Sequence, residues 1–275
     1  GDHLQTDGYA AGEKVVNACE TLLLEPHNGV LHITLNRPQN RNAMSVQMVS
    51  ELRAVLTDVA RDEQVRALVI SGAGGHFCAG ADVKDMSRAG SREGLRDLNR
   101  VFGALLQEVE ALPQVVIVVL QGAVLGGGFG LACVSDIAIA DHQAQFGLPE
   151  TSLGVLPAQI APFVVRRIGL TQARRLALTA ARFDGVEAQR LGVVHFVEHD
   201  PQGLAQRLDE VLGQVLRCAP RANARTKALL LQSLDQPLEL LLDQAADWFA
   251  EAVTGEEGIE GTRAFIEKRK ARWVS

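Results

Sequence analysis

The chain has few of the residues that build disulfide frameworks, metal centres or nucleic-acid surfaces. It has four cysteines in 275 residues, and no two of them form a CxxC pair. Aromatic residues make up 4% of the sequence, which has one tyrosine and a formal net charge of -6. The cysteine spacing argues against a zinc site, and an acidic chain poor in aromatics argues against an RNA-binding face. We therefore expect no metal and no nucleic-acid partner, and the unpaired cysteines favour a reducing cytoplasm.

Long apolar runs are also missing from the sequence. No run approaches the ~20 residues that a membrane-spanning helix needs, so we expect no membrane partner. Residues 1–19 lack the charged and apolar regions of a signal peptide. They are expected to form a flexible N-terminal extension.

Short apolar runs alternate with helical patterns over residues 20–200. Five runs have the length or β-branched content of buried strands, and they lie at 22–24, Val30–Leu35, 67–70, Val115–Leu120 and 137–140. This order predicts βα units and therefore an α/β core. Residues 201–275 carry helical spacing without a further strand pattern, so they are expected to form a C-terminal helical region.

The C-terminal region has more apolar surface than one thin helix can hide. Pro220 and Pro237 separate its helical pieces, because proline disturbs the preceding turn. The runs 229–231 and 240–242, with the neighbouring Phe249, require another surface to cover them. Either the chain's own core or another subunit would serve.

Two glycine-rich turns each follow an apolar run that is expected to be a strand. The glycines at 126–128 follow Val115–Leu120 and precede an apolar helical pattern, where the first N–H groups of a helix are free. The second turn passes from residue 72 to small residues at 78–82. One such turn is more often only a tight connection, but two N–H groups from separate loops can bind one developing oxyanion.

These turns, together with residues 31–45 and 265–273, resemble the crotonase family, also called the enoyl-CoA hydratase/isomerase family. The resemblance covers about residues 20 to 273. It implies a ClpP-like spiral of ββα units with a C-terminal helical trimerisation region, in a homotrimer or a dimer of trimers. It also implies an acyl-CoA substrate held by the N–H groups of Ala79 and Gly127, with Glu150 as the catalytic carboxylate.

One catalytic position of the family is altered in this chain. The best-known hydratases have a first catalytic glutamate where this sequence has Gly130. One carboxylate can suffice if Glu150 takes a proton from water and the same group, or the bound water, returns one to the α-carbon. Without the resemblance, the simpler interpretation of Glu150 is an exposed loop carboxylate or a charge at a helix N-terminus.

Coenzyme A is expected as part of the substrate, and no separate cofactor is expected. Because the chain is acidic overall, the phosphates need local basic groups. The resemblance and the local charge point to contacts from Arg41, Asp82, Lys84, Phe265 and Lys268, the last two in some members from a neighbouring subunit. A basic C-terminal helix is as often only a solvated face.

The segment 156–165 resembles bacterial glutaconyl-CoA hydratases more than straight-chain hydratases. Members of that subgroup act on 3-methylglutaconyl-CoA or isohexenylglutaconyl-CoA and also tolerate glycine at the position of Gly130. Leu156, Gln159 and Phe163 are candidates to line the acyl pocket. We expect hydration of such a substrate, whose second carboxylate helps to orient a water or proton, with enoyl-CoA isomerisation as the alternative and a non-enzymatic binder as the third.

Overall fold

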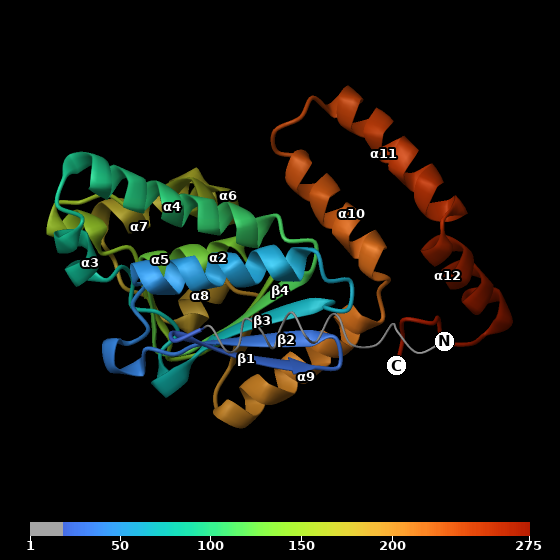
Figure 1. The fold of residues 1–275 in the computed structure, drawn as a ribbon, viewed down its shortest axis with the longest axis horizontal. Helices are drawn as coiled ribbons and strands as arrows, with labels where there is room; N and C mark the ends of the chain where they lie inside the picture. Colours follow the sequence, from blue (N-terminus) through green and yellow to red (C-terminus); the bar gives the residue numbers. More distant parts are fainter. Residues whose placement is uncertain (1–18) are drawn as a thin grey trace.

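A mixed six-stranded sheet lies at the centre of the computed structural model, which describes residues 19–275 (Figure 1). The first two strands pair antiparallel and all later neighbours pair parallel. In spatial order the strands are β1 (Leu22–His27), β2 (Val30–Leu35), β3 (Ala67–Gly72), β4 (Val115–Leu120), β6 (Ile137–Asp141) and β8 (Phe196–Glu198). A separate parallel pair consists of β5 (Ala123–Leu125) and β7 (Gln145–Gly147).

Both faces of this sheet are covered, which explains the continuous apolar runs of its strands. In β4, Val116 and Val118 belong to the larger hydrophobic core, whereas Ile117 points into a smaller core on the opposite face. The smaller core is closed by α9 (Pro201–Leu216) through Leu204, among others. The predicted strands are confirmed, with each of the five runs lying within or forming an observed strand.

Helices cover the other face of the sheet and then continue beyond it (Figure 1). The core helices besides α9 are α2 (Val46–Ala60), α3 (Val83–Arg88), α4 (Arg92–Glu110), α5 (Gly127–Val134), α6 (Ala161–Ile168), α7 (Leu170–Thr179) and α8 (Gly185–Leu191). Short 3-10 turns lie at η1 (Pro38–Asn40), η2 (Ala73–Gly75) and η3 (Glu150–Leu153). Side-chain caps fix the starts of α2 and α4. The Ser45 hydroxyl accepts a hydrogen bond from the Met48 N–H, and the Ser91 hydroxyl accepts one from the Gly94 N–H.

The last three helices form an arm that extends away from the sheet (Figure 1). The arm consists of α10 (Pro220–Gln232), α11 (Leu238–Thr254) and α12 (Glu256–Glu267). The predicted helical region begins at α9, but α9 packs on the sheet, so the projecting part starts at α10. The expected N-terminal extension lies outside the described residues except for Cys19. Over residues 19–275, every helix is too short or too polar to span a bilayer.

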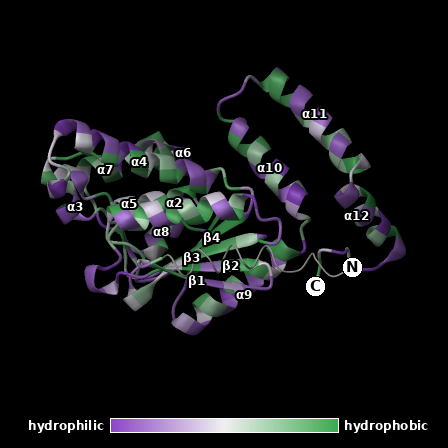
Figure 2. Ribbon diagram, viewed as in Figure 1, coloured by the Kyte–Doolittle hydropathy of each residue, from purple (hydrophilic) through white to green (hydrophobic). Residues whose placement is uncertain are grey.

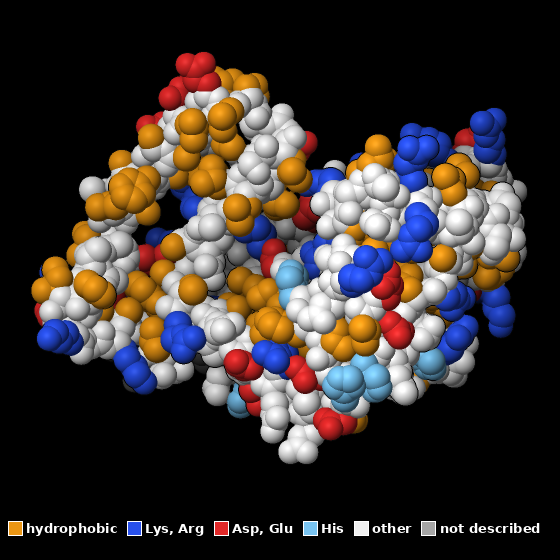
Figure 3. Space-filling view, turned by 180° about the vertical axis from the view of Figure 1, so that it is seen from behind, with side chains coloured by type: hydrophobic (Ala, Val, Ile, Leu, Met, Phe, Trp, Pro, Cys, Tyr) orange, Lys and Arg blue, Asp and Glu red, His pale blue; other side chains and the backbone are white. Residues whose placement is uncertain are grey.

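Much of the arm's apolar surface stays uncovered within one chain. Hydropathy colouring shows apolar residues along α11 and α12, and the rear view shows hydrophobic side chains gathered along the arm (Figures 2 and 3). Phe249 in α11 is 71% exposed, and Phe265 in α12 is 86% exposed. The chain therefore covers the runs that the sequence singled out only in part: Leu241 is buried, whereas Leu230, Leu240 and Leu242 are exposed.

One lysine anchors the start of the arm to the core. The Nζ of Lys227 in α10 donates to the carbonyls of Leu112 and Gln114, each at 2.6 Å, and lies 2.6 Å from a carboxylate oxygen of Asp136. Its side chain is 11% exposed. The same Asp136 oxygen accepts the N–H of Val116 at the start of β4. Lys227 thus ties the arm to the segments that lead into the inner strands β4 and β6.

Replacing Lys227 with methionine should lower the free energy of unfolding by about 3 kcal/mol, because Asp136 and two carbonyls lose their donor in a largely buried place. Urea unfolding followed by circular dichroism measures this change. The control is Lys270→Met, which removes an exposed charge of the same kind and should change stability by less than about 0.5 kcal/mol. Equal effects of the two variants would contradict the anchoring role.

Candidate active site

The loop after β3 is joined directly to β5 by backbone hydrogen bonds. The Cys78 N–H donates to the Ala123 carbonyl at 2.9 Å, and the Leu125 N–H donates to the Cys78 carbonyl at 3.0 Å. Gly80 Cα consequently lies 3.6 Å from the position that a Cβ atom on Gly126 would take. The two glycine-rich turns therefore lie side by side, although they are distant in sequence.

The N–H of Ala79 is already used inside the protein. It donates to the carbonyl of Arg41 at 3.0 Å, so the structure contradicts the prediction that Ala79 supplies an oxyanion donor. The available group belongs to Ala81. Met44 donates to the Gly80 carbonyl and accepts the Asp82 N–H, which forms a parallel bridge between Met44 and Ala81. In such a bridge the N–H of the central residue points away from the partner strand.

Within residues 19–275, the N–H of Ala81 has no hydrogen-bond acceptor, and Ala81 lines the same cavity as Gly127. The sequence carries a weak signal for this choice. Asp82 is the N-cap of α3, where its side chain accepts the N–H groups of Lys84 and Asp85, so Ala81 is the last loop residue before a fixed helix start. The sequence shows the small residues at 78–82 but does not show which of their N–H groups faces the cavity.

Gly127 begins α5, a helix whose eight residues are all buried. The preceding Gly126 has φ 53, a conformation that favours glycine, and its N–H donates to the Gly147 carbonyl. A Cβ atom on Gly127 would lie 2.9 Å from the ring of Phe102, so only glycine leaves this N-terminus open under that ring. The free N–H groups and the positive end of the helix dipole face the cavity.

The other end of α5 is closed by a buried guanidinium. Arg167 in α6 donates to the Ser135 carbonyl at 2.6 Å and to the Val193 carbonyl at 2.9 and 3.0 Å. A cation at a helix C-terminus complements the helix dipole. Arg167 thereby fixes α5 from the end that does not face the cavity.

Glu150 lies at the start of η3 with its carboxylate directed at the Gly126 turn. A Cβ atom on Gly126 would lie 2.8 Å from Glu150 Oε1. The other oxygen, Oε2, is buried and has no hydrogen-bond partner in the part of the chain that the structure describes. Burial raises the pKa of this carboxyl above the ordinary 4.5 of a glutamate. An unpaired, desolvated carboxylate is well suited to act as a base.

The position of Gly130 is closely packed against apolar side chains. A Cβ atom there would lie 3.2 Å from one side-chain carbon of Ile160 and 3.5 Å from Leu106. Ile160 lines the cavity, so its wall is apolar at the place where the resemblance implies a glutamate in the best-known hydratases. The glycine that stands in place of the family's first catalytic glutamate is therefore surrounded by apolar side chains.

The cavity beside these groups has a volume of about 430 Å³ and mostly apolar walls. Leu156 and Gln159 line it as expected, whereas Phe163 is not among its lining residues and instead packs against the core. Its polar lining residues are Ser45, Asp82, Asp85, Asn99, Glu150 and Gln159. Residues 19–275 include no group of three or more His, Cys, Asp or Glu side chains placed to hold a metal ion.

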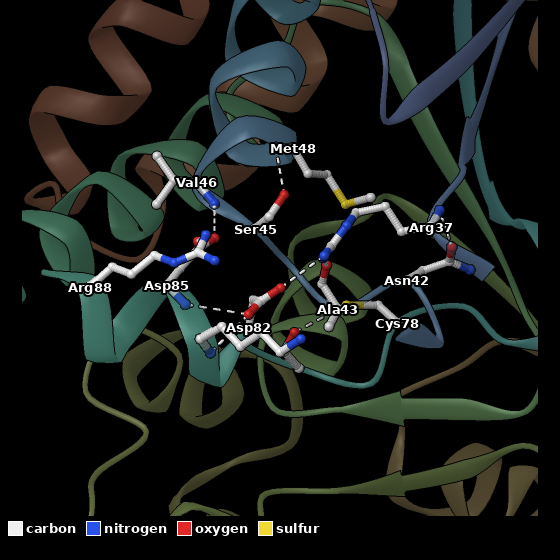
Figure 4. A network of polar contacts seen from close by, with 12 residues as sticks. Arg37, Asn42, Ala43, Ser45, Val46, Met48, Cys78, Asp82, Asp85 and Arg88 are labelled. Carbon is white, nitrogen blue, oxygen red and sulfur yellow. Dashed lines mark hydrogen bonds and ion pairs between the residues drawn. The ribbon is translucent and has the colours of Figure 1, made fainter. Parts of the chain in front are cut away.

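Asp82 has a structural role in this arrangement. Its carboxylate forms an ion pair with Arg37 at 2.8 Å and caps α3, and these hydrogen bonds keep its pKa below the ordinary value despite the opposing effect of burial (Figure 4). The neighbouring Asp85 accepts the Val46 N–H at the start of α2 (Figure 4). Asp82 therefore holds the loop that carries Ala81, and its carboxylate is already satisfied by protein groups.

The residues expected at coenzyme A fall into two places. Lys84 is exposed in the first turn of α3, next to the lining residues Val83 and Asp85, and Arg41 lies in the turn whose carbonyl accepts the Ala79 N–H. Phe265 and Lys268 lie at the end of α12, on the opposite side of the molecule from α3 (Figure 1). One chain does not bring the two sets together.

Comparison with known proteins gives long matches. A family model described as Enoyl-CoA hydratase/isomerase matches residues 25–275. The Bos taurus protein named Enoyl-CoA hydratase domain-containing protein 2, mitochondrial, is 34% identical over 96% of this chain and 90% of its own length. Mevalonyl-coenzyme A hydratase sidH of Aspergillus fumigatus is 33% identical over 94% of this chain and 95% of its own.

Solved structures show the same architecture. Pseudomonas aeruginosa AtuE is 69% identical, with a TM-score of 0.92, and the match covers 93% of this chain and 100% of that one. An enoyl-CoA hydratase/isomerase from Marinobacter aquaeolei is 53% identical, with a TM-score of 0.92 over 94% of this chain and 100% of that one. These matches confirm the expected α/β fold with C-terminal helices.

Introducing glutamate at Gly130 should destabilise the protein without restoring a second acid. The new side chain would have to displace Ile160 and bury a charge among apolar groups, which should lower the unfolding free energy by about 3 kcal/mol. Thermal and urea unfolding measure the loss. The control is Gly213→Glu in α9, where an added Cβ meets no atom within 4 Å. Comparable stability of both variants, together with faster turnover in Gly130→Glu, would contradict the packing argument.

Proposed function

The chain belongs to the enoyl-CoA hydratase/isomerase family, and from this membership we propose that it adds water across the double bond of an enoyl-CoA thioester through Ala81, Gly127 and Glu150. Relatives named as hydratases support its assignment as an enoyl-CoA hydratase-type lyase. One observation carries the proposal for the site. One oxygen of Glu150 faces the turn before Gly127, the other is buried without a partner within residues 19–275, and Ala81 and Gly127 line the same cavity as this carboxylate.

The proposed reaction uses backbone groups for charge and one side chain for protons. The thioester oxygen accepts from the Ala81 and Gly127 N–H groups, which stabilise the negative charge of the enolate by about 3 kcal/mol each. Glu150 takes a proton from water while the water oxygen bonds to C3. The proton then passes to C2, so the two hydrogens and the oxygen of one water molecule are all found in the product.

A single carboxylate serves in both proton steps, because Gly130 has no side chain and the apolar side chains of Ile160 and Leu106 pack around it. This observation also favours the second candidate function, enoyl-CoA isomerisation, in which one base moves a proton from one carbon of the acyl chain to another. The two functions differ in product. Hydration consumes the enoyl absorbance and gives a hydroxyacyl-CoA, whereas isomerisation gives another enoyl-CoA.

For the substrate, we propose a 3-substituted glutaconyl-CoA such as isohexenylglutaconyl-CoA or 3-methylglutaconyl-CoA. Two features support this choice: the resemblance of residues 156–165 to glutaconyl-CoA hydratases and the large apolar wall of the cavity. That wall includes Leu95, Leu98, Val101, Phe102 and Leu156. An alkyl branch on C3 would find apolar surface there.

Replacing Glu150 with glutamine should reduce hydration of 3-methylglutaconyl-CoA at least about 100-fold, because the proton acceptor is lost. In the unaltered enzyme, kcat/KM should fall on acidification with a midpoint above pH 4.5, since the carboxylate form is needed and burial raises its pKa. That acid limb should be absent from the residual activity of the variant. Steady-state rates across pH measure both effects, with the exposed Glu93→Gln as the control. Full hydration activity in Glu150→Gln would exclude the assigned role.

We also propose that the chain assembles as a homotrimer or a dimer of trimers. The uncovered apolar residues of the arm support assembly, because a monomer seldom leaves so large a patch in water. The separation of Phe265 and Lys268 from the cavity supports it independently. A neighbouring subunit's arm could bring these residues to coenzyme A.

Light scattering at micromolar concentration should give three or six times the chain mass of 29.6 kDa. Phe249→Asp should shift the distribution towards smaller species, because a charge replaces an exposed aromatic side chain that requires cover. The control is Gln236→Asp, an exposed polar position of the same arm. A mass of one chain at every concentration would rule out the proposed assembly.

A further inference from the structure

A small polar cluster lies on α4 at Gly103, apart from the catalytic groups. The Nε2 of Gln159 donates to the Oδ1 of Asn99 at 3.0 Å. The Oε1 of Gln159 packs against Gly103 so closely that a Cβ atom there would overlap it. The Nη1 of Arg100 lies 3.1 Å from that same Cβ position. Gly103 therefore allows an amide from the segment after η3 to lie between Asn99 and Arg100.

Three other polar side chains of the cavity lining each have a partner within the described chain. The Ser45 hydroxyl accepts the Met48 N–H, Asp82 pairs with Arg37 and Asp85 accepts the Val46 N–H. Glu150 is assigned to the reaction. Asn99 and Gln159 are the lining residues that have side-chain N–H groups to offer a polar group of the acyl chain.

The donors of this pair outnumber its acceptors. One N–H of Gln159 is used by Asn99, and the other amide N–H groups of the two side chains have no partner within residues 19–275. An amide NH₂ group offers two donors. The open positions of the pair therefore suit an acceptor such as a carboxylate.

Arg100 adds a positive charge beside this pair. Its guanidinium donates to the Oε1 of Gln107 at 3.2 Å and has no carboxylate within 4.0 Å in the described chain. Hydrogen bonds between a guanidinium and a carboxylate are about twice as strong as neutral ones. The exposed Arg100 guanidinium does not itself line the cavity, but it lies beside the Gln159 amide, because both groups approach the same position on Gly103.

We propose that Asn99, Gln159 and Arg100 bind a carboxylate on the acyl chain beyond the double bond and so select carboxylated enoyl-CoA substrates. This inference rests on the proposed hydratase function and assigns the residues that choose its substrate class. They are specificity residues and make no contact with the reacting carbons. The amides supply N–H donors at the cavity wall, and the guanidinium supplies the opposite charge.

Binding of unreactive analogues tests the inference without turnover. Glutaryl-CoA and butyryl-CoA are saturated acyl thioesters, and the first carries the additional carboxylate. Calorimetry on the unaltered enzyme should give at least about tenfold tighter binding of glutaryl-CoA. Arg100→Met and Gln159→Met should each reduce that preference about tenfold or abolish it. Arg96→Met, an exposed arginine of the same helix, is the control and should keep the preference.

Kinetics with 3-methylglutaconyl-CoA and crotonyl-CoA separates the possible failures. The two variants should lower the ratio of kcat/KM values between these substrates, with the loss mainly in the KM for the carboxylated one. An equal fall in kcat for both would overturn the inference and indicate that the pair orients water instead. Hydration of crotonyl-CoA without any preference for the carboxylated ligands would also overturn it while leaving the proposed function standing. Hydration of neither substrate, despite a preference for glutaryl-CoA, would overturn only the proposed function.

Discussion

The backbone ladder between Cys78 and β5 is the constraint on which the site depends. Cys78 exchanges hydrogen bonds with Ala123 and Leu125, so the loop after β3 behaves as an additional edge of the short β5–β7 sheet. Because these are main-chain bonds, they fix the distance between the two turns whatever the surrounding side chains are. Ala81 and the start of α5 then line one cavity. The ion pair of Asp82 with Arg37 stabilises the turn that carries Ala81. Arg167 stabilises α5, which begins at Gly127, from its far end.

The carboxylate is kept in an environment that does not stabilise it. Glu150 has a buried oxygen without a partner, and its pKa is raised by burial with no opposing charge to lower it. A paired carboxylate such as Asp82 is held in its ionised form and makes a poor proton carrier. The structure thus contains two acidic groups that line one cavity and have pKa values shifted in opposite directions, as the structural role of Asp82 and the proposed role of Glu150 require.

The strands and the helix start at Gly127 could be predicted from the sequence because each depends on local pattern. Val115–Leu120 is apolar throughout since both faces are covered, and the glycines at 126–128 mark the helix start at Gly127. The proposed donor in the loop after β3 could not be predicted in this way. Whether Ala79 or Ala81 turns its N–H inward depends on a bridge to Met44, a contact distant in sequence. The closure of the wall at Gly130 by Ile160 is likewise a tertiary contact.

One chain brings together only some of the residues expected to bind the substrate and its coenzyme A. The cavity has the proposed donors and base, and Lys84 lies next to its lining residues, whereas Phe265 and Lys268 end a helix on the far side of the molecule. If these residues contact coenzyme A, they must do so in another copy of the chain. Apolar faces of α11 and α12 would be buried by the same association. Substrate binding would then be linked to assembly, because a ligand held by two subunits stabilises the contact between them.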